Sequence, residues 1–261
     1  MTDDLYDLRL KTALAHRILT MTGSMGDITG HVFVRVPGTD EILVRGRNQT
    51  DVSPAFVEPD AIRRVDMDGN PGEDLADYWV PPERFIGTTI MKARPEINCV
   101  IHAHPPAQVL CSITGVDIRP IVGSQNHAGA ALAHDGIPIY PRSLLIHSPA
   151  LGRAMMSVMG NKNVVLLKAH GNVVAGRSVE EATVNAVRLE NLARLCWQVA
   201  LSHREVWEIP LEDWEDHVRP REGPRPIGMP EGTTWNWDFY LKMLEQGALV
   251  PQESTVGLEQ F

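Results

Sequence analysis

Two histidines separated by one residue stand at the end of an apolar stretch in this 261-residue sequence. The stretch INCVIHAHPP carries His102 and His104, and Pro105 and Pro106 follow directly. Side chains alternate along a strand, so residues i and i+2 point to the same face, and prolines end strand pairing. Two neutral imidazoles side by side can bind a divalent metal, but two ligands make a weak site. The alternative is that both are ordinary polar residues at a strand end.

A third imidazole and a carboxylate are available elsewhere in the chain. The run NVVLLKAHG predicts a buried strand that ends at His170, and Gly171 then lets the backbone turn sharply. Glu83 lies in the first turn of a predicted helix that leads into the strand with the two histidines. Each has a structural alternative, because His170 could be a hydrogen-bonded core histidine and Glu83 a carboxylate favoured by the helix dipole. Three other histidines are expected on the surface: His16, His203 and His217.

The helices and strands that would position these residues are predicted from hydrophobic periodicity and from the residues that typically begin or end such elements. Helices are expected over residues 3–21, 81–94, 107–114, 149–159, 178–203 and 235–246. The helix over 149–159 has Ser148 as a predicted N-cap, and Ser178 and Glu181 form a predicted capping box. Strands are expected in HVFVRV, EILVR, INCVIHAH, IRPIV, IPIYP and NVVLLKAHG. Helices alternating with short strands indicate an α/β protein.

Composition narrows the class of protein. The formal net charge of −9 and the lack of any Lys/Arg run argue against a nucleic-acid partner. Hydrophobic residues make up 43% and charged residues 22%, which is typical of a globular protein with a full core. The three cysteines are widely spaced and odd in number, so no disulfide framework is expected. With no apolar run near the roughly 18 residues of a membrane span and no signal-peptide core, we expect a cytoplasmic protein without a membrane partner.

Together, Glu83, RPEINCVIHAHP and VVLLKAHGNVVAG resemble the class II aldolase/adducin family over about residues 8–200. The resemblance implies a single three-layer α/β/α domain with a central, mainly antiparallel sheet, here residues 1–203. Residues 204–261 would be an extension that packs on the domain or on a neighbouring subunit. The family is usually a homotetramer with active sites between subunits. The resemblance also implies one divalent metal per subunit (zinc, manganese, iron or cobalt), with Glu83 as a ligand, an acid/base group or both, and three histidine ligands: His102, His104 and His170.

Departures from the family pattern bear on the substrate. Its sugar-phosphate aldolases carry Gly-Asn and Ser-Ser where this chain has Gly26-Asp27 and Pro81-Pro82. Prolines offer neither a hydroxyl nor a backbone N–H, and Asp27 adds negative charge, so a sugar phosphate is disfavoured. The segment GDITGHVFVRVPGTDEILVRG and the Trp/Tyr-rich tail resemble instead the branch that decarboxylates hydroxylated aromatic or pyridine dicarboxylates.

This resemblance implies a metal-dependent, non-oxidative decarboxylase, with 3,4-dihydroxyphthalate the expected substrate. The alternatives are an aldolase or epimerase acting on a small non-phosphorylated hydroxy-carbonyl compound, and a non-catalytic scaffold like the adducins, which should have lost metal ligands. Guanidinium groups bind carboxylates bidentately, so Arg35, Arg45, Arg47 and Arg63 are substrate-binding candidates. Arg45 and Arg47 rank higher because they end the second expected strand, with a surface role as the alternative for either. Further candidates for substrate binding are Asp27, Ser124, His127 and Tyr240. The polar cluster 124–127 could equally be a solvent loop, and Trp235, Trp237 and Tyr240 could be interface core.

Overall fold

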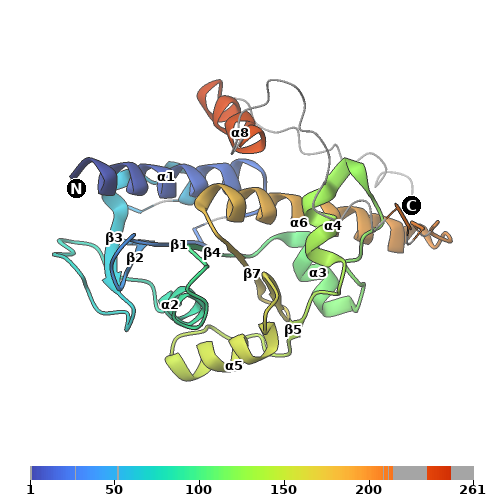
Figure 1. Ribbon diagram of the computed structural model, residues 1–261, viewed down its shortest axis with the longest axis horizontal. Coiled ribbons are helices and arrows are strands. Elements are labelled where there is room, and N and C mark those ends of the chain that lie inside the picture. The colour runs from blue at the N-terminus through green and yellow to red at the C-terminus, as the bar shows by residue number, and fades with distance from the viewer. Residues whose placement is uncertain are drawn as a thin grey trace.

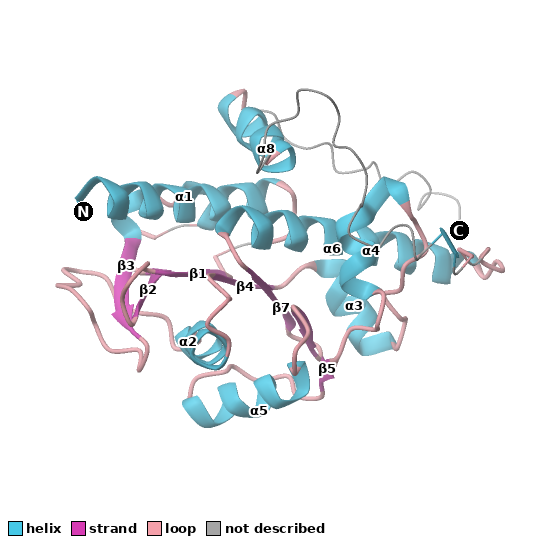
Figure 2. Cartoon of the chain, in the orientation of Figure 1, coloured by secondary structure: helices cyan, strands magenta, loops and turns pink. Residues whose placement is uncertain are grey.

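The structure is a computed structural model that describes residues 2–26, 28–51, 53–207, 209–210, 212–213 and 234–247. One sheet is covered by helices on both faces (Figures 1 and 2). Its strands are β1 (His31–Arg35), β2 (Glu41–Arg45), β3 (Ile62–Asp66), β4 (Cys99–Ala103), β5 (Ile139–Tyr140), β6 (Val164–Leu167) and β7 (Gly171–Gly176). Its α-helices are α1 (Thr2–Met21), α2 (Arg84–Ala93), α3 (Pro106–Thr114), α4 (His127–Ala133), α5 (Pro149–Met159), α6 (Val179–Ser202) and α8 (Trp235–Glu245). Short 3₁₀ turns are η1 (Pro54–Phe56), η2 (Pro59–Ala61) and η3 (Ser124–Asn126).

The strands lie in the order β3-β2-β1-β4-β7-β6-β5. Every neighbouring pair is antiparallel except β5 and β6, which are parallel. The predicted α/β class and the mainly antiparallel central sheet are therefore confirmed. The central pair β4 and β7 carries the predicted histidines near the same end of the sheet, because Ala103 lies opposite Asn172.

Two apolar cores lie on opposite faces of the sheet. Helices α1 and α6 pack on one face, and α2 and α5 on the other, which gives three layers (Figure 1). Strand β4 follows the alternation expected of a strand buried on both faces, since Cys99 and Ile101 join the first core and Val100 joins the second. His102 therefore points to the face covered by α2 and α5, and Glu83 directly precedes α2.

Several expected elements differ in the structure. The segment IRPIV contains no strand, because Pro120 cannot donate to a ladder and the N–H of Ile121 instead bonds to the carbonyl of Arg119. The expected helix over 81–94 begins only at Arg84. The run NVVLLKAHG ends its strand at Leu167, before a turn that leads into β7. Strands β3 and β7 and helix α4 were not predicted.

His16 was expected on the surface, and this prediction was wrong. The side chain is fully buried where α1 covers the sheet. Its Nδ1 lies 2.9 Å from the carbonyl of Thr12, and its Nε2 accepts the N–H of Val32 in β1 at 3.2 Å. A carbonyl only accepts, so Nδ1 carries the proton and the neutral ring is satisfied on both sides. His16 is thus a core residue that ties α1 to the sheet, whereas His203 is exposed as expected.

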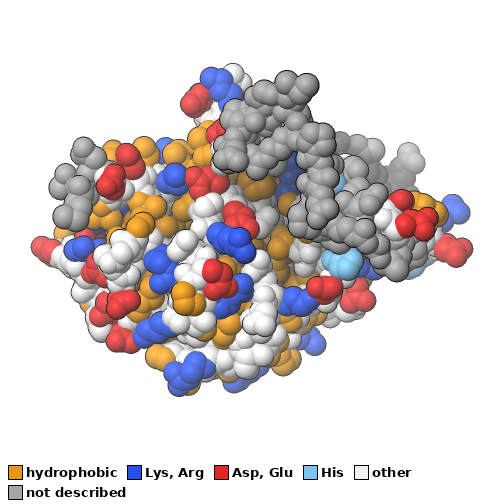
Figure 3. All heavy atoms as spheres, in the orientation of Figure 1, with side chains coloured by type: hydrophobic (Ala, Val, Ile, Leu, Met, Phe, Trp, Pro, Cys, Tyr) orange, Lys and Arg blue, Asp and Glu red, His pale blue; other side chains and the backbone are white. Residues whose placement is uncertain are grey.

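The C-terminal helix α8 lies across α1 and α6 (Figure 1). Its Trp237 and Tyr240 are buried in the same core as α1 and α6, whereas Trp235 is 62% exposed. On the face seen in Figure 3, acidic and basic side chains are intermixed. None of the described helices combines the length and apolarity needed to cross a bilayer.

Candidate metal centre

The end of β4 places two imidazoles side by side. His102 is the fourth residue of β4, and His104 lies just past its end, so the two-residue repeat of the strand directs both rings to one side. Their ring centroids are 4.9 Å apart, and their Nε2 atoms are 3.2 Å apart. His102 is fully buried, and its Nδ1 lies 2.7 Å from the backbone carbonyl of Asn172. His104 is half-buried, and its Nδ1 lies 3.0 Å from the hydroxyl of Thr29.

The third imidazole comes from the turn between β6 and β7. Ala169 adopts the left-handed conformation there, with a φ of 54°. Its N–H donates to Ser112 Oγ in α3 at 3.1 Å, and its carbonyl accepts the hydroxyl of Ser143 at 3.1 Å. These two hydrogen bonds hold the turn, and the turn directs His170 toward His102 and His104. The ring centroid of His170 lies 4.9 Å from that of each.

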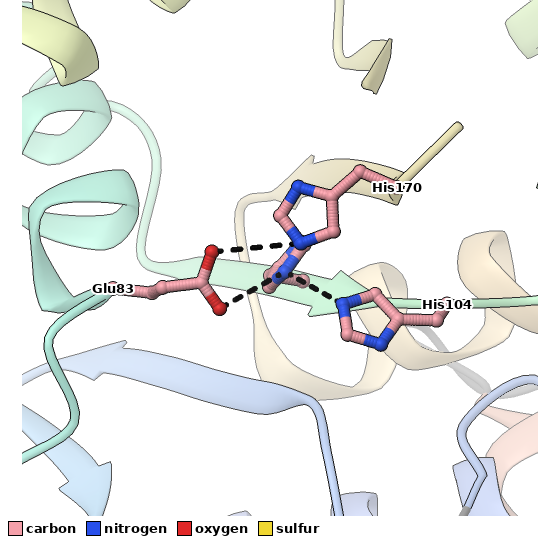
Figure 4. Close-up of side chains that lie close together, drawn as sticks. Glu83, His104 and His170 are labelled. Atoms are coloured by element: carbon pink, nitrogen blue, oxygen red, sulfur yellow. Dashed lines mark hydrogen bonds and ion pairs between the residues drawn. The ribbon is translucent and has the colours of Figure 1, made fainter. Parts of the chain in front are cut away.

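Glu83 supplies the carboxylate from the N-cap position of α2. Its side chain makes no capping hydrogen bond and turns instead toward the histidines. One oxygen lies 3.4 Å from Nε2 of His102, and the other lies 3.6 Å from Nε2 of His170 (Figure 4). The oxygen facing His170 also accepts the N–H of Ile146 at 3.4 Å. The carboxylate is therefore buried and turned toward the three imidazoles.

The donor set fits a divalent cation. The ring proton of His102 lies on Nδ1, because the carbonyl that it faces can only accept. The lone pair of Nε2 therefore points at His104 and Glu83. Nε2 of His170 is buried and has no hydrogen-bond partner among the described residues. The four ligand atoms all lie within 4.8 Å of one another. Converging acceptors repel unless protons or a cation lie among them, and three imidazoles with one carboxylate suit zinc, manganese, iron or cobalt.

Protonation equilibria favour the same state. Burial, followed by the charges of its histidine neighbours, lowers the pKa of His104 to about 4, and burial also lowers the pKa of His170. Both rings are thus neutral near pH 7 and can offer lone pairs. Burial raises the pKa of Glu83, whereas its histidine neighbours, His102 first among them, lower it to about 2, so the carboxylate is ionised near pH 7. An ionised carboxylate and neutral imidazoles are the ligand forms that a metal requires.

The two arginines ranked for substrate binding both form ion pairs with Asp51. Arg45 is fully buried, and its Nη2 donates to Asp51 at 3.1 Å and to the carbonyl of Ile28 at 2.8 Å. Arg47 donates to the same carboxylate oxygen at 3.2 Å. Two donors of Arg45, Nε and Nη1, have no hydrogen-bond partner among the described residues. By strand alternation Arg45 shares the α1 face of β2 with Leu43, and so lies on the opposite face from His102.

Of the remaining candidates that the structure describes, none contacts the four clustered residues within one chain. Tyr240 is buried in α8 among residues of α1 and α6, in the layer opposite Glu83. Ser124 begins the turn η3, and His127 begins α4, so the expected loop at 124–127 is largely helical. Asp27 lies outside the described residues. Arg35 donates to the carbonyls of Met91 and Ile97, and Arg63 lies 4.3 Å over the ring of Tyr78.

Sequence reasoning missed the residues that surround the four. Thr29 and Asn172 hold the far nitrogens of His104 and His102. His31 stands opposite His102 in the β1–β4 ladder, with its ring 6.5 Å away, and its Nδ1 has no hydrogen-bond partner among the described residues. The alternation of His31 with Phe33 on one face of HVFVR was a usable signal. Nothing in the sequence indicated Thr29.

A three-layer α/β/α domain with three histidines and a glutamate gathered at one end of a mainly antiparallel sheet defines the class II aldolase type of metal centre. Comparisons with known proteins agree. The model of the family described as "Class II Aldolase and Adducin N-terminal domain" matches residues 11–197. The chain belongs to this family, so the predicted resemblance is confirmed.

Two curated relatives and one solved structure are similar over most of the chain. The chain is 40% identical to a 3,4-dihydroxyphthalate decarboxylase of Arthrobacter keyseri over 77% of its own length and 82% of the relative. It is 38% identical to a 3,4-dihydroxyphthalate decarboxylase of Rhodococcus jostii (strain RHA1) over 82% and 88%. The fold is similar to that of an aldolase II superfamily protein from Pseudomonas syringae, with a TM-score of 0.77, 20% identity and 93% coverage of both chains.

Proposed function

We propose that this protein is a metal-dependent, non-oxidative decarboxylase that converts a hydroxylated aromatic dicarboxylate, 3,4-dihydroxyphthalate, to the monocarboxylate and carbon dioxide. The observation that carries the proposal is the similarity, at 34–40% identity, to three relatives named for this reaction. The cluster of Glu83 with three histidines supports it, because a scaffold without activity has no need to keep four convergent ligands.

The reaction needs an electron sink and a proton. Breaking the bond between the ring carbon and the leaving carboxylate leaves an electron pair on that carbon, and one proton must replace the carbon dioxide. A divalent ion held by Glu83, His102, His104 and His170 would supply Lewis-acid stabilisation of this negative charge. Glu83 is ionised at the cluster and has no proton of its own near pH 7, so we assign it to hold and polarise the water that delivers a proton to the ring carbon, the hydroxide left behind combining with the released carbon dioxide as bicarbonate.

The substrate also brings two carboxylates that need partners. Arg45 and Arg47 remain our predicted partners, since Arg45 has two buried donors without a hydrogen-bond partner among the described residues, although within one chain Arg45 is buried on the face of the sheet opposite His102. Both would have to exchange part of their bonding to Asp51 for the substrate. The roles in substrate binding of Asp27, Ser124, His127 and Tyr240 remain predictions.

We further propose a cytoplasmic homotetramer with its active sites at subunit interfaces. The family resemblance supports the assembly, and the three buried free cysteines suit a reducing compartment. Light scattering coupled to size exclusion tests the assembly, and a stable monomer of the 28.9 kDa chain would contradict it.

Product analysis tests the reaction. Purified protein of measured metal content would be given 3,4-dihydroxyphthalate, 4,5-dihydroxyphthalate, protocatechuate and a hydroxypyridine dicarboxylate. We expect carbon dioxide from the first, without an aldehyde, lost with chelator and restored by added metal. His170→Ala should lower both bound metal and turnover, whereas His203→Asn, at an exposed left-handed position that suits asparagine, should change neither. Aldehyde release without carbon dioxide would favour the aldolase alternative, and turnover without metal would contradict the assignment.

A further inference from the structure

A chain of buried amides connects the metal cluster to a charged residue on another helix. Asn172 lies directly beyond His170 and Gly171, at the start of β7. Its backbone carbonyl accepts Nδ1–H of His102 at 2.7 Å, and its side-chain oxygen accepts the N–H of Ala103 at 3.2 Å. Asn172 thus holds the strand end that carries His102 by two hydrogen bonds, one of which fixes the tautomer of the ligand.

The chain continues through α3 to α6. Nδ2 of Asn172 donates to Oε1 of Gln108 at 2.8 Å, and Nε2 of Gln108 lies 3.4 Å from Oε2 of Glu190. All three side chains are buried, with Gln108 and Glu190 at 0% exposure. The residues lie on β7, α3 and α6, so the connection crosses the packing between the sheet and the α6 layer.

The orientation of every amide in this chain is determined. Ala103 can only donate its N–H, so the atom of Asn172 that faces it must be the oxygen, and the Nδ2 group must face Gln108. Gln108 therefore turns its oxygen toward Asn172 and its NH₂ group toward Glu190. The final partner must accept, and only a carboxylate at residue 190 can do so while also accepting the other donors around it.

Glu190 accepts from four donors. Besides Nε2 of Gln108, these are the backbone N–H groups of Ala107 at 3.2 Å and Gln108 at 3.4 Å, and Nε of Arg194 at 3.0 Å. The two backbone groups belong to the first turn of α3, which starts two residues after His104. The carboxylate thus fixes the segment after His104 directly, and the segment of His102 through two amides.

We propose that Glu190 is a positioning residue of the metal site, which acts through Gln108 and Asn172 to hold His102 and His104 with their Nε2 atoms turned toward the ion. Partners that orient metal-ligating histidines commonly change metal affinity by about 10- to 100-fold when they are replaced. The inference rests on the metal binding proposed above, and its test separates the two.

Glu190→Gln is nearly isosteric, yet it leaves one acceptor where two sets of donors converge. With its oxygen toward Gln108, its NH₂ group would oppose the N–H of Ala107 and Nε–H of Arg194 and loosen the first turn of α3; with its oxygen toward Ala107, its NH₂ group would oppose the NH₂ group of Gln108. Relief by rotation of Gln108 would turn that NH₂ group toward Asn172, and rotation of Asn172 would then oppose two donors at Ala103. Each of these arrangements leaves two donors opposed next to a segment that carries His102 or His104. We therefore expect weaker metal binding, although all four ligands are present.

The experiment is a titration of chelator-treated protein with Co²⁺, followed by visible absorption, which reports both the dissociation constant and the ligand geometry. We expect Glu190→Gln to weaken Co²⁺ binding by about 10-fold or more and to alter the absorption bands. The exchange Gln108→Glu with Glu190→Gln restores an acceptor at 108 and a donor at 190. It should recover most of the affinity and the original bands, because only the weak 3.4 Å contact to the backbone N–H of residue 108 stays unmatched.

Two further variants keep the result interpretable. Thr183→Val removes a buried hydroxyl of the same helix that bonds to the carbonyl of Val179, and it should leave Co²⁺ binding unchanged. Gln108→Met breaks the same chain if Glu190→Gln does not fold, and should weaken Co²⁺ binding likewise. Unchanged affinity and bands in Glu190→Gln, or a loss that the exchange does not recover, would overturn the proposal. Absence of Co²⁺ binding in the unaltered protein would instead overturn the proposed metal site.

Discussion

At the scale of single residues, the metal centre is determined by which lone pairs are left unbonded. Asn172 and Thr29 engage the Nδ1 atoms of His102 and His104, and the opposite nitrogens converge on the carboxylate of Glu83. The sequence predicted that the four ligand side chains would meet: the spacing of His102 and His104 is local, and the family resemblance added Glu83 and His170. The groups that orient them could not be predicted, because Asn172 and Thr29 reach their histidines across 70 and 75 residues of chain.

Glu83→Gln should weaken metal binding and reduce turnover by about 100-fold or more, because both carboxylate oxygens face imidazole lone pairs and an amide offers one acceptor only. Metal content after dialysis, measured beside steady-state turnover, checks this. A variant with full metal content and lost turnover would show instead that Glu83 carries protons without ligating the ion.

His16 gives the protein an acid-sensitive element in the core between α1 and the sheet. Burial, followed by the charge of Arg45, lowers its pKa from 6.5 to about 3, so the unfolded chain binds a proton between these values that the folded chain does not. The contribution of His16 to the free energy of unfolding is therefore retained above pH 6.5 and is lost progressively as the pH falls. Between pH 7 and 5 the free energy of unfolding should decrease by about 2 kcal/mol more than in His16→Gln. Urea unfolding of both proteins at the two pH values checks this, and parallel losses would contradict it.

At the scale of elements, close approach of two strands builds the site. A Cβ on Gly171 would lie 2.1 Å from the carbonyl oxygen of Ala103 and 2.7 Å from Cδ2 of His104. Glycine at the start of β7 therefore allows the turn of His170 to lie against the end of β4. The sequence indicated a sharp turn here, but not the contact that demands it.

Gly171→Ala should lower the free energy of unfolding by about 1–3 kcal/mol and also weaken metal binding, since His104 must move. Gly176→Ala, at the other end of β7, meets the backbone N of Ala182 at 2.8 Å and is a matched control. It should lower stability while leaving metal affinity unchanged. Thermal melts and metal titrations of both variants check this, and equal metal affinities would contradict the prediction.

Periodicity predicted most helices and the alternating strands, and it failed where local signals conflict. Strand β3, IRRVD, carries two adjacent arginines that hide its alternation. Strands β6 and β7 are both apolar and flank a short turn, so they were interpreted as one strand that ends at His170. Helix α4, HAGAALA, is too short and too uniformly small to show an apolar face. In each case tertiary packing determines the structure, and a single sequence does not record it.

At the scale of the whole molecule, the last described helix, α8, packs against the first, α1. Helix α8 packs on α1 and α6 through Trp237 and Tyr240, so the C-terminal part stabilises a layer that carries none of the metal ligands. The division of the chain at residue 203 remains a prediction, but the buried contacts of α8 show that residues 234–247 contribute to the core of the domain.

Trp237→Ala should lower the free energy of unfolding by about 3–5 kcal/mol, because it empties a large buried site between α8 and its neighbours. Trp235→Ala removes a side chain that is 62% exposed and should stay within about 0.5 kcal/mol of the unaltered protein. Urea unfolding of the pair checks this. Equal stabilities would place the packing of α8 in doubt, whereas metal affinity should be the same in both variants.

The hydrogen bond between His102 and Asn172 also has a consequence for biosynthesis. Translation proceeds from the N-terminus at about 5–20 residues per second, so His102 leaves the ribosome several seconds before Asn172. A nascent chain that ends before Asn172 already contains both histidines of β4, yet the carbonyl that fixes the proton of His102 on Nδ1 does not exist. We therefore expect loading of the proposed metal to be completed only after β7 has paired with β4.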